Sequence, residues 1–504
     1  MQKLWLIGIL FLFIQVRTSG QEQVLYQVKD FEFDNISIDS ALSIIEFKTG
    51  LHFTFRSDLL KKSGQVNAHF KDFPLCIVLD SLFANPGLNY QIIESQLVVY
   101  EEKQELASPK QNTDSLTNSK DIAFGGKIKD TQSGELLPFA AISILHTTSG
   151  TISNEDGVFF LRISPEYKND TLIISYLGYR SLRIPLSEIS YYNIYHLEPT
   201  SIPLQEVVIR SLHPENLIRM AIAYKKENYP IQAFVQRAFY RESIKRDKKI
   251  MLYSEGILEV LKRPYRPTLF QERVKLIKQR SFKSIEREDT VKIKLHGGIQ
   301  SSLDLDVVKN SFSFIDGEGM RDYAYTMRDM VMNDDKLTYM IEFHPKDSKV
   351  PYTFDGYIYL DVKSLAFVKI EFQYTKASLQ KMRNAFIIRQ SPRLLILPQE
   401  ARYTVTYKEA EGKYYIHHIW GELNLKVKLK RKFLSSKYSA NFEMVATDIQ
   451  GNAPRRFSAS ESMNTNKIFS DLSPNYDLKF WGNENFLLPE DDLMKALKQL
   501  TIEL

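Results

Sequence analysis

The sequence predicts a multi-domain, mainly β protein: a small α+β domain, then a β-sandwich, then a large curved antiparallel sheet, half-barrel-like, with helices. Three observations predict this. The chain has 504 residues, of which 43% are hydrophobic and 25% charged, enough for about three packed domains. Helical and extended patterns alternate before residue 102. From Phe124 onward, short alternating strands separated by turn residues dominate.

Residues 1–20 have the layout of a secretory signal peptide. Lys3 gives a positive start, Leu4 to Val16 is apolar, and the small residues Ser19 and Gly20 follow. We expect cleavage after Gly20 and a periplasmic protein, for which association with the outer membrane is a further hypothesis; an uncleaved anchor is the alternative to cleavage. The apolar run is short for a bilayer, which needs about 20 residues. No later stretch predicts a transmembrane helix, so we expect no transmembrane segment after signal cleavage.

Cysteine content and net charge argue against a disulfide-stabilised protein and against a nucleic-acid-binding protein. The single cysteine, Cys76, rules out an intramolecular disulfide, and its apolar surroundings favour a buried structural residue over a nucleophile. A net charge of +5 is small for this length and does not favour nucleic acid as a partner.

Residues 28–102 predict a compact α+β domain of order β-α-β-β-α-β-β. Ser37 and Asp39 are helix N-cap residues before a helical apolar pattern that Gly50 ends. The run from Phe31 to Leu42, and the paired strands around Tyr90 and Val98, resemble the secretin and TonB short N-terminal domain. The resemblance implies a periplasmic module that binds regulatory or energy-coupling partners.

Residues 103–120 predict a linker, and residues 121–210 a β-sandwich. The linker is rich in Gln, Asn, Ser, Thr and Lys and cannot bury enough apolar surface to order itself. About seven short strands follow, with turn signals between them. Asp156-Gly157 suits a turn with positive φ, which favours turn formation over calcium binding.

The sandwich also resembles a known family. Gly126-Lys-Ile-Lys-Asp, Leu137-Pro-Phe-Ala-Ala, Leu172-Ile-Ile-Ser-Tyr-Leu-Gly-Tyr and Leu204-Gln-Glu-Val-Val-Ile are similar to the carboxypeptidase regulatory-like domain at the front of Bacteroidetes TonB-dependent receptors. The resemblance implies a transthyretin-like sandwich without catalytic residues. One departure is Phe139, because the family usually has glycine after that proline.

Residues 211–504 predict an antiparallel sheet domain with a terminal helix. A helix is expected at Asn216 to Asn228, hairpins around Asp361-Val-Lys-Ser and Ala410-Glu-Gly, and a final helix opening at Pro489. The hairpin from Tyr352 to Phe372 is similar to that of lipoprotein-carrier half-barrels. Together with Phe480-Trp-Gly and the final helix, it also resembles uncharacterised Bacteroidetes proteins that place a regulatory-like domain before such a sheet.

Aromatic residues of this sheet form the candidate site for a hydrophobic ligand such as lipid. The alternative, which we favour, is that they simply make an ordinary core. A stripe of lysines at 426, 428 and 430 predicts the solvated face of a strand, with contact to anionic lipid heads as the alternative. The candidate ligand-face residues are Tyr357, Tyr359, Phe367, Phe372, Tyr374 and Trp420.

No catalytic, cofactor or metal site is predicted. His213-Pro-Glu215 lacks the spacing of a zinc peptidase, and adjacent His417 and His418 in a regular strand would point to opposite faces. Ser378-Leu-Gln-Lys381 matches a penicillin-binding pattern by chance, because its partner patterns are missing or misplaced. Four acids are candidates to pair for acid-base work, with turn or solvated roles as the favoured alternative: Asp304, Asp306, Asp316 and Glu318.

The functional prediction is therefore a non-enzymatic envelope protein that binds or assembles partners, linked to TonB-type receptor machinery. Strand edges of the two N-terminal domains would serve for β-augmentation. We expect no transporter barrel, since the chain remaining after the sandwich is short and ends Thr501-Ile-Glu-Leu. The alternatives are a periplasmic lipid carrier and a hydrolase with a dispersed site.

Overall fold

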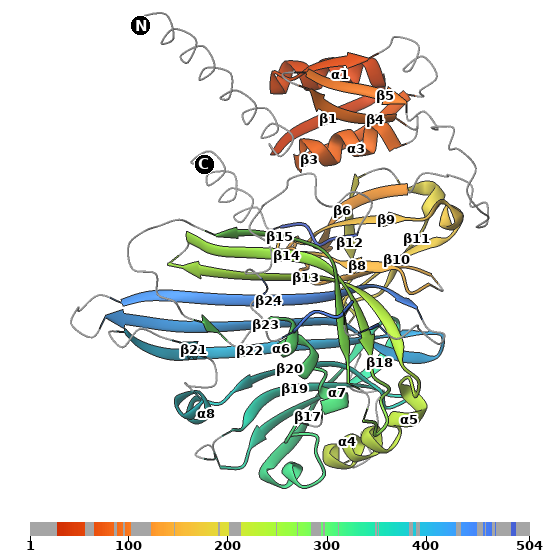
Figure 1. Ribbon diagram of the computed structural model, residues 1–504. Helices are drawn as coiled ribbons and strands as arrows, with labels where there is room; N and C mark the ends of the chain where they lie inside the picture. The colour runs from red at the N-terminus through yellow and green to blue at the C-terminus, as the bar shows by residue number, and fades with distance from the viewer. Residues whose placement is uncertain are drawn as a thin grey trace, which may run out of the picture.

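A computed structural model gives the architecture (Figure 1). The predicted signal peptide, linker and final helix beyond Pro489 lie outside the described residues, as does the side chain of Cys76. The structure describes residues 28–55, 65–84, 88–93, 96–101, 122–145, 147–189, 192–200, 213–247, 249–269, 271–283, 294–295, 298–310, 312–347, 350, 352–382, 387–389, 394–429, 435–450, 457–458, 460–465, 469 and 485–489.

The N-terminal module, residues 28–101, has the predicted element order. Ser37 accepts a hydrogen bond from the Ser40 N–H at the start of α1, and Gly50 ends that helix at φ 72°. One sheet pairs β1 with β3, and the other has the order β2-β5-β4. The elements are β1 (Val28–Ser37), α1 (Ile38–Thr49), β2 (His52–Phe55), β3 (Gln65–Pro74), α3 (Leu75–Ala84), β4 (Leu88–Ile93) and β5 (Gln96–Glu101).

The sandwich, residues 122–200, consists of two sheets of order β11-β10-β7-β8 and β12-β6-β9, as predicted. Gly157 turns at φ 69°, and the Asn154 side chain accepts hydrogen bonds from the Asp156 and Val158 N–H groups, so this segment is a turn. The strands are β6 (Ile122–Asp130), β7 (Ala141–Ile144), β8 (Gly150–Ile152), β9 (Val158–Ile163), β10 (Thr171–Ser175), β11 (Leu182–Pro185) and β12 (Tyr192–Leu197). The 3-10 helices are η2 (Pro165–Tyr167) and η3 (Leu186–Glu188).

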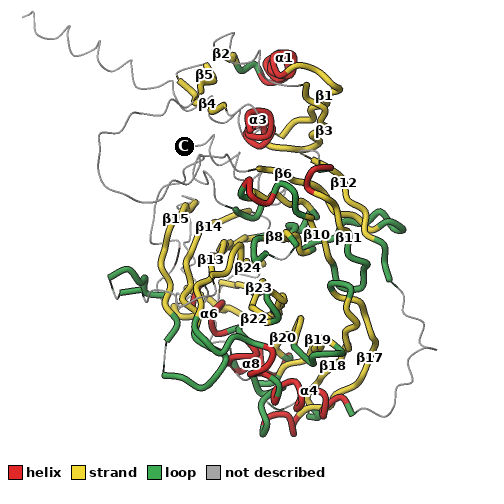
Figure 2. The backbone as a smooth tube through the Cα atoms, turned by 90° about the vertical axis from the view of Figure 1, so that its right-hand side faces the viewer, coloured by secondary structure: helices red, strands yellow, loops and turns green. Residues whose placement is uncertain are grey.

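The sheet domain, residues 213–469, contains one antiparallel sheet of order β15-β14-β13-β24-β23-β22-β20-β19-β18-β17. Figure 2 shows this sheet bending strongly from β15 to β17. Both predicted hairpins form. The strands are β13 (Phe234–Arg246), β14 (Lys249–Lys262), β15 (Arg273–Lys283), β17 (Tyr323–Asn333), β18 (Lys336–Pro345), β19 (Phe354–Asp361), β20 (Phe367–Tyr374), β22 (Leu394–Ala410), β23 (Lys413–Leu429) and β24 (Ser435–Gln450), with a separate pair β16 (Lys294–Leu295) and β21 (Ile387–Arg389).

Helices of the sheet domain are short. The helix predicted at Asn216 to Asn228 starts earlier, at Pro214, and is interrupted at Tyr224, whose ψ of 13° leaves the helical range. The helices are α4 (Pro214–Ala223), α5 (Lys225–Asn228), α6 (Ile299–Asp304), α7 (Val307–Asn310), η4 (Gly319–Asp322) and α8 (Lys376–Lys381).

The large sheet has two faces with different neighbours. The inner face carries Ile358, Phe372 and Val405, which share a buried cluster with residues 298–310 and 312–322, here called the covering segment. The outer face turns toward the sandwich: Ile152 of β8 is buried with Phe239 and Val445 of the sheet. Side chains alternate between the two faces along each strand.

Residues 485–489, here called the C-terminal segment, lie where the three parts meet. Leu488 belongs to the buried cluster of the N-terminal module, whereas Leu487 lies in the cluster between sandwich and sheet. Ala123 and Phe160 of the sandwich also belong to the N-terminal cluster. Among the described residues, no helix is long and apolar enough to cross a membrane.

Candidate functional site

The six aromatic residues predicted to line a ligand face are divided between the two faces of the sheet. Tyr357 and Tyr359 alternate with the inner residue Ile358, so both lie on the outer face. The Tyr359 hydroxyl donates to Glu371 over 3.0 Å. Trp420 lies 6.3 Å from the Phe139 ring of the sandwich, so it is also on the outer face. Phe372 and Tyr374 are on the inner face, and Phe367 pairs with Leu360 in the register. No single surface collects all six.

The covering segment fills the inner face with aromatic contacts. Phe314 stacks on Phe343 with ring centroids 4.3 Å apart, and it also meets Phe354 and Phe372 at 5.7 and 5.3 Å. Phe312 approaches Phe372 at 5.3 Å. These rings form a packed core, in which Phe372 is the one member of the candidate set. Ligand binding by the predicted face stays a prediction.

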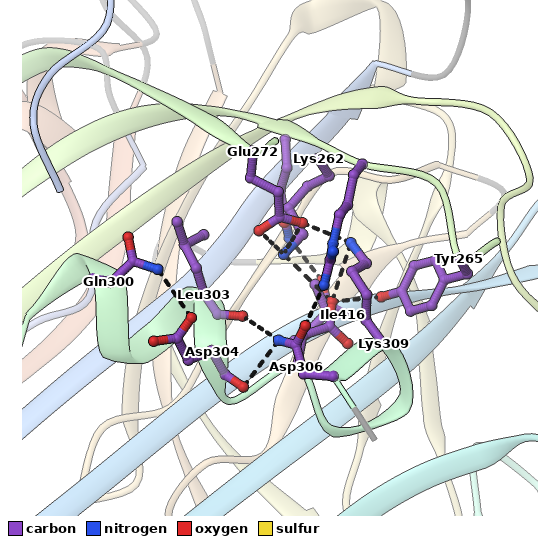
Figure 3. Close-up of polar contacts among 12 residues, drawn as sticks. Lys262, Tyr265, Glu272, Gln300, Leu303, Asp304, Asp306, Lys309 and Ile416 are labelled. Atoms are coloured by element: carbon purple, nitrogen blue, oxygen red, sulfur yellow. Dashed lines mark hydrogen bonds and ion pairs between the residues drawn. The ribbon is translucent and has the colours of Figure 1, made fainter. Parts of the chain in front are cut away.

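Four buried charges clamp the covering segment to the sheet (Figure 3). Lys309 of α7 and Lys262 at the end of β14 each contact both Glu272 and Asp306. The shortest of these contacts joins Lys309 Nζ to Glu272 Oε1 at 2.7 Å. The side chains of the two lysines are 2–3% exposed and that of Asp306 is 0% exposed. Two cations and two anions therefore balance one another away from water.

Two tyrosine hydroxyls complete the coordination of Asp306. Tyr265 donates to one carboxylate oxygen and Tyr407 to the other, each over 3.0 Å. The Tyr407 hydroxyl also accepts the Val308 N–H over 3.1 Å. Lys309 Nζ lies 4.4 Å from the centre of the Tyr265 ring, a cation–π contact. The cluster thus joins α7 to β22 and to the chain between β14 and β15.

The charges shift one another's pKa. Burial alone would raise the pKa of Glu272 and Asp306, but the two ammonium groups outweigh burial and hold both below their usual values. Burial, followed by the neighbouring Lys262, lowers the pKa of Lys309 to about 8 despite the two carboxylates. Each charge has a partner and none is open to solvent. The arrangement is suited to holding the covering segment in place.

The four acids considered for acid-base chemistry do not form a pair. Asp306 belongs to the buried cluster, whereas Asp304 is exposed and accepts from Gln300 over 2.9 Å. Asp316 accepts the Gly317 N–H in an exposed turn, and Glu318 is exposed beside it. Turn and solvated roles thus hold for three of the four. No sequence pattern indicates the buried cluster, because it joins residues 262–272 to residues 306–309 and to Tyr407, which lie far apart in the chain.

The outer face carries the contact with the sandwich. Phe139 adopts φ 61°, the left-handed conformation that explains why the family prefers glycine there, and its ring stacks on His418 at 5.5 Å. His418 in turn contacts Glu443 over 2.7 Å. A β-bulge leaves His417 as the extra residue between Thr406 and Tyr407 of the paired strand. The prediction that the two histidines point to opposite faces assumed regular alternation along the strand. The bulge interrupts that alternation at His417.

Glu32, Asp34 and His69 of the N-terminal module could together supply three metal ligands, a group that sequence reading missed. Glu32 and His69 face each other across β1 and β3, with His69 Nδ1 3.1 Å from Glu32. All three side chains are more than half exposed. The contacts are those of a surface ion pair, and such exposed groups are common in strands without a metal.

Comparison with known proteins supports the sandwich assignment. Residues 124–209 match the CarboxypepD_reg-like domain family. No curated protein matches the chain. Among solved structures, a DUF1329 family protein from Desulfovibrio piger is 14% identical with a TM-score of 0.21, covering 49% of this chain and 97% of its own. A putative membrane-associated protein of unknown function from Bacteroides fragilis is 9% identical with a TM-score of 0.13, covering 66% and 98%.

Proposed function

We propose that this chain is a non-enzymatic binding or assembly protein of a Bacteroidetes-type envelope, exported to the periplasm and linked to TonB-type receptor machinery at the outer membrane. The regulatory-like sandwich supports this, because that family is characteristic of such receptors. The N-terminal module resembles their short N-terminal domain in sequence, and its order of strands and helices is the expected one. In this proposal the sandwich and the sheet domain carry the N-terminal module and present it to a partner protein.

The observation that carries the proposal is the exposed aromatic side chain of Phe47. It lies on α1 and is 92% exposed, whereas α1 buries Ala41, Leu42 and Ile45 on its other side. Figures 1 and 2 both place α1 on the side of the module away from the sandwich and α3 nearer to it. Exposed aromatic side chains are enriched where proteins bind one another.

A strand edge packs against the same helix. β2 packs against α1 and pairs with β5 on one side; no second strand pairs with it among the described residues. The Phe53 N–H is bonded to Glu46 over 2.6 Å, which occupies one donor of this edge. We infer that a partner contacts Phe47 and extends along β2. Edge addition of this kind uses main-chain hydrogen bonds for affinity and side-chain pockets for specificity.

The test is crosslinking and pull-down from the native envelope with Phe47→Asp. We expect the variant to lose the partners that the wild type captures while keeping its stability, because substitutions at exposed sites change stability by about 0.5 kcal/mol or less. Leu269→Asp is the matched control, since Leu269 is as exposed but lies in the sheet domain. An unchanged set of partners for Phe47→Asp would reject the proposal.

A lipid carrier is less favoured by the geometry. The inner face is the natural ligand cavity of a half-barrel, but here it packs on the covering segment, which the buried charges hold. Three of the predicted ligand-face aromatics lie on the other face. Entry of a lipid would require the covering segment to leave its site.

A further inference from the structure

The C-terminal segment is held by its backbone, as a bound peptide is. Arg241 of β13 donates to the carbonyl oxygens of Leu487 and Leu488, the second over 3.4 Å. The Asn154 side chain donates to the carbonyls of Leu488 and Pro489 over 3.2 and 3.3 Å. Three successive carbonyls therefore meet side-chain donors from two different parts of the molecule.

Asn485 anchors the other end of the segment to a strand edge. Its side-chain oxygen accepts the Arg162 N–H over 2.7 Å, and its side-chain amide donates to the Arg162 carbonyl over 2.9 Å. Arg162 belongs to β9, which is an edge strand of its sheet. One asparagine side chain thus imitates the pair of hydrogen bonds that a neighbouring strand would make.

The apolar side chains of the segment enter sites built by different modules. Phe486 meets the Phe160 ring of the sandwich at 5.8 Å. Leu487 is 2% exposed, in the cluster with Phe239 and Ile152, and Leu488 is 6% exposed, in the cluster of the N-terminal module. Burying a leucine side chain is worth about 1.5–3 kcal/mol, so this part of the contact is not incidental.

Arg241 is itself positioned by a second buried charge network. Glu255 has a fully buried side chain and contacts Arg241 at 3.4 Å and also Arg280, while the Tyr253 hydroxyl donates to it. Two guanidinium groups share one carboxylate, which leaves Arg241 with donors directed at the carbonyls of the segment. A fixed donor of this kind binds an extended backbone without a large ordering cost.

We propose that the seam between the three modules is a peptide-binding groove for an extended segment of Asn followed by large apolar residues. The chain's own residues 485–489 fill it in cis and thereby lock the N-terminal module to the sandwich and the sheet. Because the recognition is directed at the backbone and at two leucine sites, a peptide of the same sequence binds in trans once the tethered segment is disabled.

The test uses the full-length chain and a fluorescent peptide with the sequence of residues 483–491. In the disabled chain, Leu487→Asp and Leu488→Asp prevent the tethered segment from entering its apolar sites. We expect that chain to bind the peptide at least tenfold more tightly than the wild type, where the tethered segment competes at about millimolar effective concentration. Fluorescence anisotropy measures both affinities.

Asn154→Asp distinguishes loss of peptide binding from loss of folding. The carboxylate keeps the acceptor that holds the 154–158 turn but loses both donors to the segment. Added to the disabled chain, it should weaken peptide binding about tenfold. Equal binding with and without Asn154→Asp would mean that the peptide binds elsewhere, and no binding by a folded disabled chain would also overturn the proposal.

A calorimetric readout covers the case in which the double variant does not fold. Asn154→Asp alone, in the otherwise intact chain, should separate unfolding of the N-terminal module from the rest and lower its melting temperature by several degrees, because the lock is weakened. Leu269→Asp serves as the surface control. Unfolding of the module that is unaffected by Asn154→Asp would contradict the locking role.

Discussion

At the scale of single residues, Phe139 combines an unfavourable backbone conformation with a useful side chain. A non-glycine residue at positive φ is strained by about 1 kcal/mol. The Phe139 ring, however, contacts His418 and Trp420 across the boundary between sandwich and sheet. The strain lies in the backbone and the contact is made by the side chain, so two different substitutions can measure them separately.

Phe139→Ala should destabilise the protein more than Phe139→Gly. Both variants lose the ring contacts, but glycine also relieves the left-handed strain, so the two free energies of unfolding should differ by about 1 kcal/mol. Urea denaturation followed by circular dichroism measures the difference. If alanine were as stable as glycine, positive φ at this position would carry no cost.

Residue-level prediction from the sequence succeeded where the signal is local. The Ser37 cap, the Gly50 helix end and the Asp156-Gly157 turn depend on neighbouring residues only, and all three form. The buried role of Asp306 was missed, because its tyrosine partners Tyr265 and Tyr407 are 41 and 101 residues away in sequence. A charge in a sequence does not show which distant charge will neutralise it.

At the scale of elements, the covering segment depends on acids that remain ionised. Glu272 and Asp306 have lowered pKa values in the folded protein because Lys262 and Lys309 outweigh their burial. Their contribution to stability is therefore present above the unfolded pKa of about 4 and is lost as the pH falls through and below that value. The clamp should release in acid.

Asp306→Asn tests this clamp. The variant leaves two buried lysines with one carboxylate and should lose about 3–5 kcal/mol of stability at pH 7. It should also show a smaller fall in stability between pH 6 and about pH 3 than the wild type. Asp304→Asn is the matched control, since its carboxylate lies two residues away outside the cluster. Burial raises the pKa of Asp304, so this variant should not make the fall in stability smaller. Urea unfolding at several pH values provides the measurement.

The strands themselves were largely predictable as elements. Alternation around the turns at Asp361 and Ala410 identifies the hairpins β19–β20 and β22–β23, and the structure extends the second pair to 17 residues in each strand. What alternation does not give is the face on which a ligand would bind. Tyr357 and Phe372 have the same apolar character, yet one lies on the outer face and the other on the inner face.

At the scale of the whole molecule, the boundary between sandwich and sheet joins two modules into one body. The Gly178 N–H donates to the Met332 carbonyl over 2.7 Å, and the Thr148 hydroxyl donates to Asp448 over 2.8 Å. Arg183 pairs with Asp335 over 2.9 Å, and Ile152 is buried against the sheet. None of these pairs is adjacent in sequence, so sequence patterns divide the chain into modules but do not reveal their union.

We therefore expect the sandwich and the sheet domain to unfold in one cooperative transition. Ile174→Ala provides the test, because Ile174 is fully buried in the core of the sandwich itself and its truncation leaves a cavity that costs about 2–5 kcal/mol. If the two modules unfold together, this loss of stability also lowers the melting temperature of the sheet domain by several degrees. The calorimetric and van't Hoff enthalpies of unfolding then stay equal. Tryptophan fluorescence, to which Trp420 at the boundary contributes, follows unfolding in parallel with calorimetry. Two separate transitions, of which only one shifts, would show that the boundary contacts are too weak to couple the modules, and the sandwich would then act as an independent domain tethered to the sheet.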